Sequence, residues 1–165
     1  MFSNRISQTL HEEHRATVAL MERLDGLIAS NRRRPPDATA PATAQLLREL
    51  AGGVEAEVNR HFDFEEQYLF TYLQTIGDEA IGAHLTDEHL AMRPLGRRLA
   101  ALARAGEASG FDEASWTEFR QLGLELCERM LAHVQKEEMA LLPLIEESMD
   151  ADMEARLYEE YVENG

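Results

Sequence analysis

HFDFEEQYLF (61–70) recurs 72 positions later as HVQKEEMALL (133–142). Each stretch places a histidine four residues before a glutamate, adds a second glutamate and ends on two apolar residues. A second repeat, at an offset of 75, pairs Glu13-His14 with Glu88-His89. The chain therefore contains a duplicated unit, and each half carries one lone histidine and one His-x-x-x-Glu motif.

Residues four apart lie on one face of an α-helix, one turn from each other, so an imidazole and a carboxylate at this spacing can reach the same ion. In an antiparallel bundle, both motifs and both lone histidines can point inward at one level. This arrangement predicts a metal pair in which each metal takes two histidines and both glutamates bridge. The candidate metal ligands are His14, His61, Glu65, His89, His133 and Glu137.

Apolar residues at three-and-four spacing predict four long helices, at about 4–29, 41–75, 79–105 and 112–148. Between them lie a segment with two prolines (31–37), a stop and N-cap at Gly77-Asp78, and a glycine-bounded loop (106–110). Gly52-Gly53 is expected to kink or interrupt the second helix, and Pro94 is expected to bend the third helix near residues 90–94. We therefore expect an all-α, up-down-up-down four-helix bundle over residues 1–148. An acidic C-terminal helix in 149–165 is expected to pack on the bundle or extend it.

The composition limits the partners and the chemistry. A formal net charge of −15 disfavours nucleic acid, and no run of 18 apolar residues or secretory signal is visible, so a cytoplasmic protein without a membrane span is expected. The single cysteine, Cys127, excludes a disulfide framework, a zinc finger and an iron–sulfur cluster. It is expected to be a small buried apolar residue. Any metal must then be held by nitrogen and oxygen, which suits a non-haem di-iron centre, with manganese or zinc as weaker candidates.

A metal-free bundle is the alternative. Each of these histidines taken alone is compatible with a surface or a hydrogen-bonded core position. Together, however, the six side chains fall on the predicted apolar faces, where unpaired imidazoles and carboxylates are costly to bury. A bound cation removes that cost, so the pattern favours the metal site.

Two further residues are weaker candidates for the site. His11 lies one turn before His14 and about 60° around the helix, so it is a candidate additional ligand or a second-layer residue. Tyr68 lies one turn beyond Glu65, where a position near the metals and plain core packing are equally compatible with the pattern.

The remaining polar residues near the motifs are expected outside the ligand set. Glu66 and Glu138 project beside the ligand face, which favours a surface role or a hydrogen bond to a ligand. His84 points about 140° away from His89 and is expected to be exposed or in a helix contact.

These residues resemble the hemerythrin-like (HHE cation-binding) family over about 5–146, including the Glu-His pair of the first helix and the Leu-Leu-Pro143 that follows the last motif. The resemblance implies a four-helix bundle with two iron ions, oxo- or hydroxo-bridged when oxidised. It assigns the same six ligands.

The sequence departs from the oxygen-carrying members at two places. Carriers have a fifth histidine four residues before the position of His89, where this chain has Leu85. They also use an aspartate five residues after the last histidine, whereas Glu137 follows His133 by four. Both differences resemble the bacterial and regulatory branch, which includes iron-centre repair proteins, peroxide- or nitric-oxide-related proteins and an iron-sensing ubiquitin-ligase domain.

Three functions remain open from the sequence. The first is a di-iron oxidoreductase acting on dioxygen, peroxide or nitric oxide, and the second is a protein that stores, carries or senses dioxygen. The third is an iron-responsive module that signals to a protein partner through the acidic C-terminal segment. Residues 136–165 contain ten Asp and Glu residues and only two basic residues. No organic-substrate site is visible, and the oligomeric state is left open.

Overall fold

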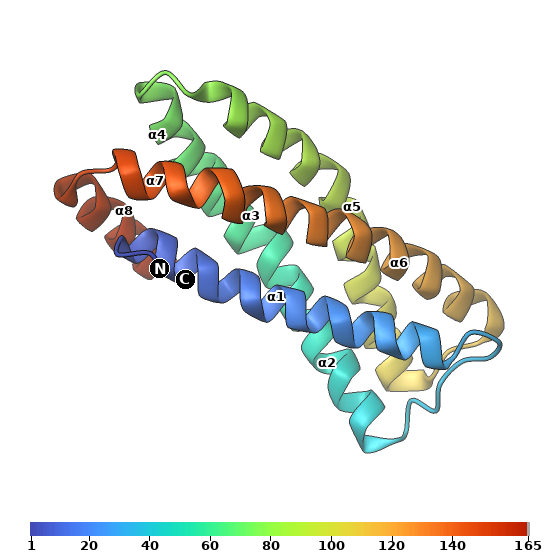
Figure 1. The fold of residues 1–165 in the computed structure, drawn as a ribbon. Helices are drawn as coiled ribbons and strands as arrows, with labels where there is room; N and C mark the ends of the chain where they lie inside the picture. Colours follow the sequence, from blue (N-terminus) through green and yellow to red (C-terminus); the bar gives the residue numbers. More distant parts are fainter. Residues whose placement is uncertain (165) are drawn as a thin grey trace.

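The computed structural model describes residues 1–164, and within that range it consists of helices and connecting loops. Four antiparallel helical rods form the bundle, and a short helix follows them (Figure 1). The first rod is α1 (Arg5–Ser30) and the third is α5 (Glu79–Ser109). The second rod joins α2 (Pro41–Ala56), η1 (Glu57–His61), α3 (Phe62–Phe64), η2 (Glu65–Leu69) and α4 (Phe70–Thr75). The fourth joins α6 (Glu113–Lys136), η3 (Glu137–Leu141) and α7 (Leu142–Ser148).

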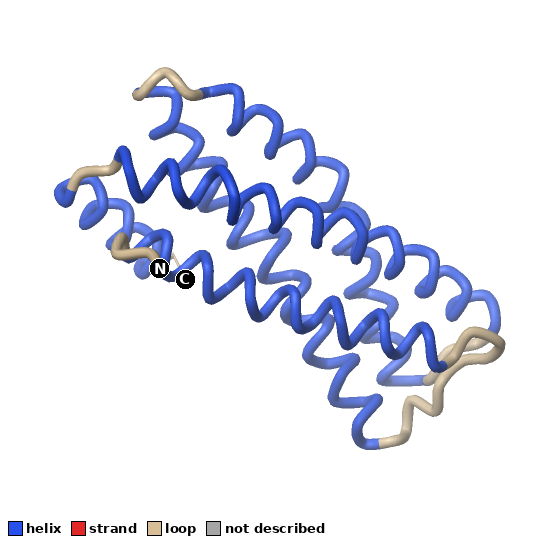
Figure 2. Tube along the Cα trace, in the orientation of Figure 1, coloured by secondary structure: helices blue, strands red, loops and turns tan. Residues whose placement is uncertain are grey.

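The expected all-α bundle is confirmed. Neighbouring rods pack in a closed ring, with α1 on α2, α2 on α5, α5 on α6 and α6 on α1, which the tube view also shows (Figure 2). Short joints between consecutive rods enforce this up-down order.

The helix ends follow from local sequence. The side chain of Asn4 accepts hydrogen bonds from the amides of Ile6 and Ser7 and so caps α1, and Asp112 forms a reciprocal capping box with Ser115. Gly77 and Gly110 have positive φ angles of 80° and 75°, which suits glycine at the ends of the second and third rods. Asp78 occupies the N-cap position of α5 as expected, but its side chain makes no capping hydrogen bond.

The two expected kinks have different outcomes. Helical structure runs without interruption through Gly52-Gly53, so of the two outcomes expected there the interruption does not occur. A Cβ atom on Gly53 would lie 2.7 Å from a methyl of Leu20, which shows that this glycine allows a close approach of α1 and α2. Pro94 lies inside α5, which continues through it but changes direction partway along (Figure 1).

The core is divided into two apolar clusters along the bundle axis. One contains Met21, Leu50, Leu99 and Phe119, and the other contains Leu10, Leu69, Leu85 and Ile145. Cys127 belongs to the first cluster, and burial raises the pKa of its thiol to about 12, as expected of a small buried residue. The polar residues described below lie between the two clusters.

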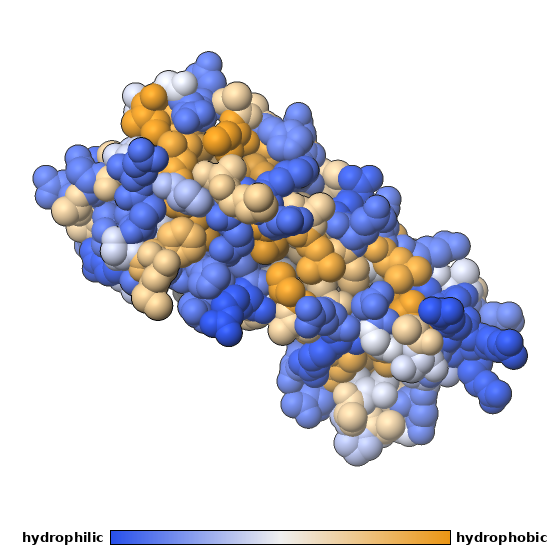
Figure 3. Space-filling view, in the orientation of Figure 1, coloured by the Kyte–Doolittle hydropathy of each residue, from blue (hydrophilic) through white to orange (hydrophobic). Residues whose placement is uncertain are grey.

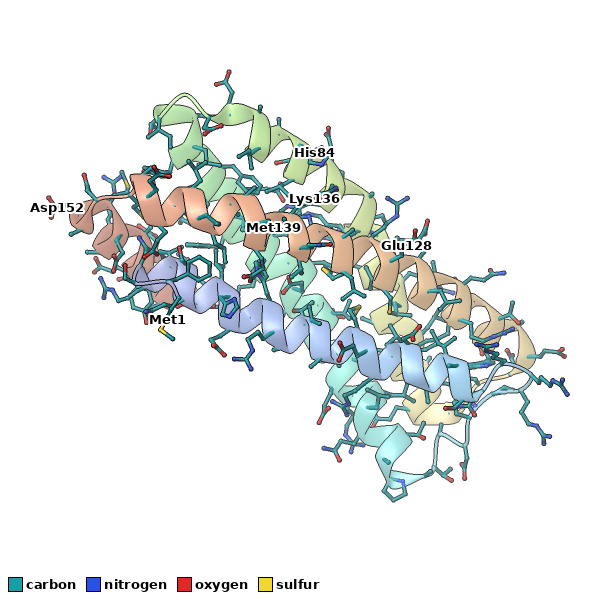
Figure 4. All side chains as sticks on the ribbon, viewed as in Figure 1. Met1, His84, Glu128, Lys136, Met139 and Asp152 are labelled. Atoms are coloured by element: carbon teal, nitrogen blue, oxygen red, sulfur yellow. The ribbon has the colours of Figure 1, made fainter. Side chains whose placement is uncertain are left out.

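The chain closes with α8 (Ala151–Glu163), which packs on α1. Leu157 is buried in the second cluster, the guanidinium of Arg5 contacts Glu154 at 2.7 Å, and the same guanidinium lies over the ring of Tyr158. Asp152, at the start of α8, lies at the extremity of the molecule (Figure 4). None of the described helices has the length and apolar character needed to cross a bilayer.

The surface is mixed in character. On the face shown in Figure 3, apolar colour is interrupted by polar side chains along the length of the bundle. The fourth rod exposes Leu124, Leu131 and Met139, the last of which is labelled in Figure 4. Single exposed apolar side chains of this kind are common on the surfaces of folded domains.

Candidate metal centre

Six titratable side chains from all four rods meet between the two apolar clusters. His14 comes from α1, His89 from α5 and His133 from α6, and each is at most 1% exposed. The other three lie at the boundaries of the η segments: His61 ends η1, Glu65 begins η2 and Glu137 begins η3. All six residues predicted from the repeat are therefore brought together.

Glu137 lies between two pairs of histidines. Its Oε2 atom is 3.0 Å from Nε2 of His14 and 4.0 Å from Nε2 of His61. Its Oε1 atom contacts Nε2 of His133 and is 4.0 Å from Nε2 of His89. One carboxylate oxygen thus faces each pair of histidines.

Glu65 occupies the corresponding place in the other half. Its Oε1 atom is 2.5 Å from Nε2 of His61, and its carboxylate also lies within 4.8 Å of the ligand atoms of His89, His133 and Glu137. Possible ligand atoms therefore gather in two groups that share Glu137. One is His14, His61 and Glu137, and the other is Glu65, His89, His133 and Glu137.

Each histidine is held from behind by a carboxylate of a neighbouring rod. Nδ1 of His61 lies 2.6 Å from Glu13, and Nδ1 of His133 lies 2.8 Å from Glu88. The two lone histidines follow the same rule, with His14 2.7 Å from Glu138 and His89 2.9 Å from Glu66. A proton on each Nδ1 then leaves the Nε2 lone pair free to face the centre, which is the tautomer that binds a metal.

This tautomer makes the centre unfavourable without a cation. The Nε2 atoms of His89 and His133 lie 3.2 Å apart, so two lone pairs face each other when both Nδ1 atoms carry the protons. Of the six buried side-chain nitrogen or oxygen atoms without a hydrogen-bond partner in the described part of the chain, five lie here: Glu57 Oε1, His61 Nε2, both carboxylate oxygens of Glu65, and Glu137 Oε1. Buried polar atoms of this kind require compensation, and a metal ion supplies it.

The charges of the metal-free centre show the same need. Burial lowers the pKa of His14, but the carboxylates of Glu137 and Glu138 outweigh it and raise that pKa to about 9. Burial also opposes protonation of His133, yet Glu137, Glu65 and Glu88 raise its pKa to about 9. Without metal, protons therefore neutralise the buried carboxylates. A divalent cation that binds here would neutralise the carboxylates in place of these protons, and the protons would be released to solvent.

The two glutamates differ in the metal-free state. Burial and repulsion from Glu137 raise the pKa of Glu65. Burial also disfavours the ionised form of Glu137, but the pKa of that carboxyl is held well below its usual range by His133, His14 and His61. Glu137 is thus the ionised carboxylate around which the histidines gather.

Three π-helical segments coincide with the centre. The segments η1, η2 and η3 begin at Glu57, Glu65 and Glu137. A π-helical turn is wider than an α-helical one, is costly in isolation and is found mostly at functional sites. The sequence pattern, built on i and i+4 spacing in an α-helix, did not predict these segments.

The weaker candidates lie outside the cluster. His11 is partly exposed and its Nδ1 lies 2.8 Å from Glu138, so it belongs behind His14 and is not among the grouped ligand atoms. Two positions were open for Tyr68, and the structure agrees with packing away from the cluster: its ring packs beside the second apolar cluster and its hydroxyl donates to Glu160 of α8 at 3.2 Å. The side chain of His84 is largely exposed, as expected. It contacts Lys136 of α6 and Glu88 of its own helix, α5 (Figure 4).

The sequence reasoning missed a third buried carboxylate. Glu57 is 5% exposed, accepts a hydrogen bond from Thr17 at 3.1 Å, and has its Oε1 atom 3.8 Å from Nε2 of His61. Its position four residues before His61 was the available signal, because Glu57, His61 and Glu65 share one helix face.

A bundle that buries four histidines and two carboxylates at one level defines the class of cation-binding helical bundles. Comparison with known families agrees, because the model of the hemerythrin HHE cation-binding domain matches residues 5–145 and again 81–163. The chain belongs to that family. The second match begins in α5, as expected when the two halves of a chain resemble each other. No curated protein matches the chain significantly.

Proposed function

We propose that this protein holds two iron ions through His14, His61, Glu65, His89, His133 and Glu137, and that the pair reacts with dioxygen, peroxide or nitric oxide. The observation that carries the proposal is the position of Glu137. Each of its oxygens faces a different pair of histidines, and both pairs have their Nδ1 atoms engaged by carboxylates. Manganese or zinc is the alternative occupant of the same nitrogen and oxygen ligands.

A bound iron pair supplies reversible one-electron oxidation and an electrophilic site for small ligands. The side chains of this protein do the rest. Glu13, Glu66, Glu88 and Glu138 fix the orientation and tautomer of the four imidazoles. The ring of Phe62 stacks on His89 with centroids 3.8 Å apart, and the two apolar clusters exclude water from both ends of the centre.

We favour consumption of the oxidant over reversible carriage. Leu85 stands where oxygen carriers have a fifth histidine, and it is buried in the second apolar cluster. Its hydrocarbon side chain cannot bind iron, so each iron keeps two histidines. Fewer nitrogen ligands leave more of each metal accessible to an incoming ligand.

The test is anaerobic loading with ferrous iron, followed by optical spectra after addition of dioxygen, peroxide or nitric oxide in separate samples. We expect a new absorption after dioxygen that persists when the gas is removed under vacuum. A spectrum that reverts under vacuum would favour carriage. Absence of iron uptake by the folded protein would contradict the proposal itself.

A second candidate function is an iron-responsive module, and one contact favours it. The hydroxyl of Tyr161 on α8 donates to the carboxylate of Glu13, which also holds His61. Arg60 lies over the Tyr161 ring and contacts Glu13 as well. This function predicts that iron loading slows proteolysis of α8. Equal cleavage of the metal-free and iron-loaded forms would argue against it.

A further inference from the structure

The two halves of the centre differ at a pair of equivalent positions. The contacts His61–Glu13 and His133–Glu88 show that the offsets of 72 and 75 in sequence are also equivalences in space. By the same offsets, Glu57 corresponds to Arg129 and Thr17 to Met92. One half therefore carries an additional carboxylate and hydroxyl where the other carries a guanidinium and a thioether.

The same difference appears in two surface pockets. The pocket between α1 and the second rod has a volume of about 200 Å³ and is lined by residues that include Thr17, Gly53, Ala56, Glu57 and His61. The pocket between α5 and α6 has a volume of about 380 Å³ and is lined by Glu88, Met92, Glu125, Glu128, Arg129 and Ala132. Each residue of the second set is equivalent by offset to a residue that lines the first. They are the same groove in the two halves, and only the residues that line it have changed.

The groove between α1 and the second rod leads to the centre. His61 lines it, whereas the equivalent His133 does not line the groove between α5 and α6. Small residues explain part of the difference, since Gly53 and Ala56 stand where the other half has Glu125 and Glu128. Glu128, labelled on α6 in Figure 4, is one of the residues that line the second groove.

Glu57 lies at the inner end of this groove with one oxygen unused. Thr17 donates to its Oε2 atom, but its buried Oε1 atom has no hydrogen-bond partner and faces His61 at 3.8 Å. Burying a carboxylate oxygen without a partner costs free energy, and Glu57 is only 5% exposed. A cation or a polar ligand bound next to this oxygen would offset that cost.

We propose that Glu57 is a seventh metal-facing side chain, specific to the metal position of His14 and His61, and that small exogenous ligands reach that position through the groove between α1 and the second rod. This inference rests on the proposed di-metal function and deepens it. It makes the two metal positions unequal, although the six ligands predicted from the sequence are related by a twofold repeat. A second pocket, lined by residues that include His11, His14 and Glu138, approaches the same metal position, but both oxygens of Glu138 already contact these histidines, so no unpaired carboxylate oxygen is left there.

The first test compares Glu57→Gln with the wild type after anaerobic loading with ⁵⁷Fe(II), using Mössbauer spectroscopy and iron counting. Two doublets of equal area are expected in the wild type. In the variant, one doublet shifts and one iron binds about tenfold more weakly, as losses next to a metal typically cause. Arg129→Gln, at the equivalent position, is the control and leaves both doublets unchanged. Thr17→Val, which removes the hydrogen bond to Glu57, shifts the same doublet and supplies a second variant if Glu57→Gln folds poorly.

The second test measures the rate at which azide binds to the oxidised, iron-loaded protein. Ala56→Trp fills the groove beside Glu57, and Ala132→Trp fills the equivalent groove between α5 and α6. We expect the first variant to slow azide binding at least severalfold and the second to leave it unchanged, with equal iron content in both. Equal rates in the two variants, or unchanged doublets in Glu57→Gln and Thr17→Val, would overturn the inference. If the wild type takes up no iron, the proposed function fails instead.

Discussion

Nδ1 of His61 lies 2.6 Å from Oε2 of Glu13, a residue of another rod that immediately precedes His14 in the sequence. Within each half of the chain, one rod thus supports the next: α1 supplies His14 directly and holds His61 through Glu13. The pair His133 and Glu88 repeats this relationship at 2.8 Å.

Replacing Glu13 with glutamine should weaken iron binding. A neutral amide oxygen accepts the Nδ1–H hydrogen bond more weakly than a charged carboxylate, and the amide nitrogen can donate instead, so the tautomer and orientation of His61 are less well fixed. We expect affinity for ferrous iron to fall by about 10–100-fold. Competition with a metal-binding indicator dye measures this. Glu12→Gln is the matched control, because Glu12 is adjacent and largely exposed, and equal losses in both variants would contradict the role assigned to Glu13.

Removal of the metals should lower the melting temperature. Two buried carboxylates and four inward-facing histidines are mutually unfavourable without cations, and a ligand that binds only the native state stabilises it. Calorimetry of the iron-loaded and metal-free protein at the same pH measures the difference. Identical melting curves would show that the centre adds nothing to the stability of the fold.

The metal-free protein should become less stable as the pH rises. His14 and His133 have native pKa values of about 9 against an ordinary value of 6.5. Their charged forms therefore stabilise the native state fully below pH 6.5, and this stabilisation disappears as the pH rises through 9. The pKa values of Glu66, Glu88 and Glu138 are lowered, despite partial burial, by their hydrogen-bonded partners. Their contribution is present above their ordinary value of 4.5 and is lost as the pH falls.

Urea unfolding of the metal-free protein at several pH values checks this profile. We expect the highest free energy of unfolding between about pH 5 and 6.5 and a steady fall toward pH 9. Iron binding needs neutral imidazoles, so the affinity for iron should change in the opposite direction and rise with pH over the same range. A metal-free protein whose stability increases up to pH 9 would contradict the assigned charges.

Packing beside the centre should depend on Gly96. A Cβ atom there would lie 2.7 Å from a methyl of Val58 in η1 and 3.1 Å from a methyl of Val54 in α2, so Gly96→Ala forces the second rod and α5 apart. We expect a loss of about 1–3 kcal/mol in the free energy of unfolding. Gly52→Ala is the control, since nothing lies within 4 Å of the added atom and the helix gains about 0.5–1 kcal/mol. Urea unfolding of both variants measures these two changes. Equal changes in the free energy of unfolding would be inconsistent with close packing at Gly96.

The bundle and the six residues of the cluster were accessible from the sequence because both depend on periodicity. A repeat of His-x-x-x-Glu on an apolar face defines which side chains point inward, whatever the details of the helix crossings. Glu13 and Glu88 were not recognised as partners of His61 and His133, because a glutamate next to an inward histidine also suits a solvated face. Which rod lies opposite it depends on tertiary packing.

The asymmetry of the centre was also missed, for a different reason. A comparison of motifs detects residues that the two halves share. Glu57 and Thr17 make the halves unequal because the equivalent residues are Arg129 and Met92, so such a comparison overlooks them. Gly52-Gly53 does not interrupt the second rod, because tertiary packing of Gly53 against Leu20 compensates for a weak local helix propensity. Helix spacing alone left Tyr68 open between a position near the metals and core packing, because the partner of its hydroxyl comes from α8, which that spacing does not include.

The central claim is that six buried side chains hold two metal ions, and counting iron per chain tests it most directly. Protein refilled anaerobically with ferrous iron and freed of excess should contain close to two irons per chain by elemental analysis. His61→Ala should lose at least one of them, while His84→Ala, which alters an exposed histidine of α5, should keep both. One iron or none in the wild type, or two irons in His61→Ala, would contradict the account.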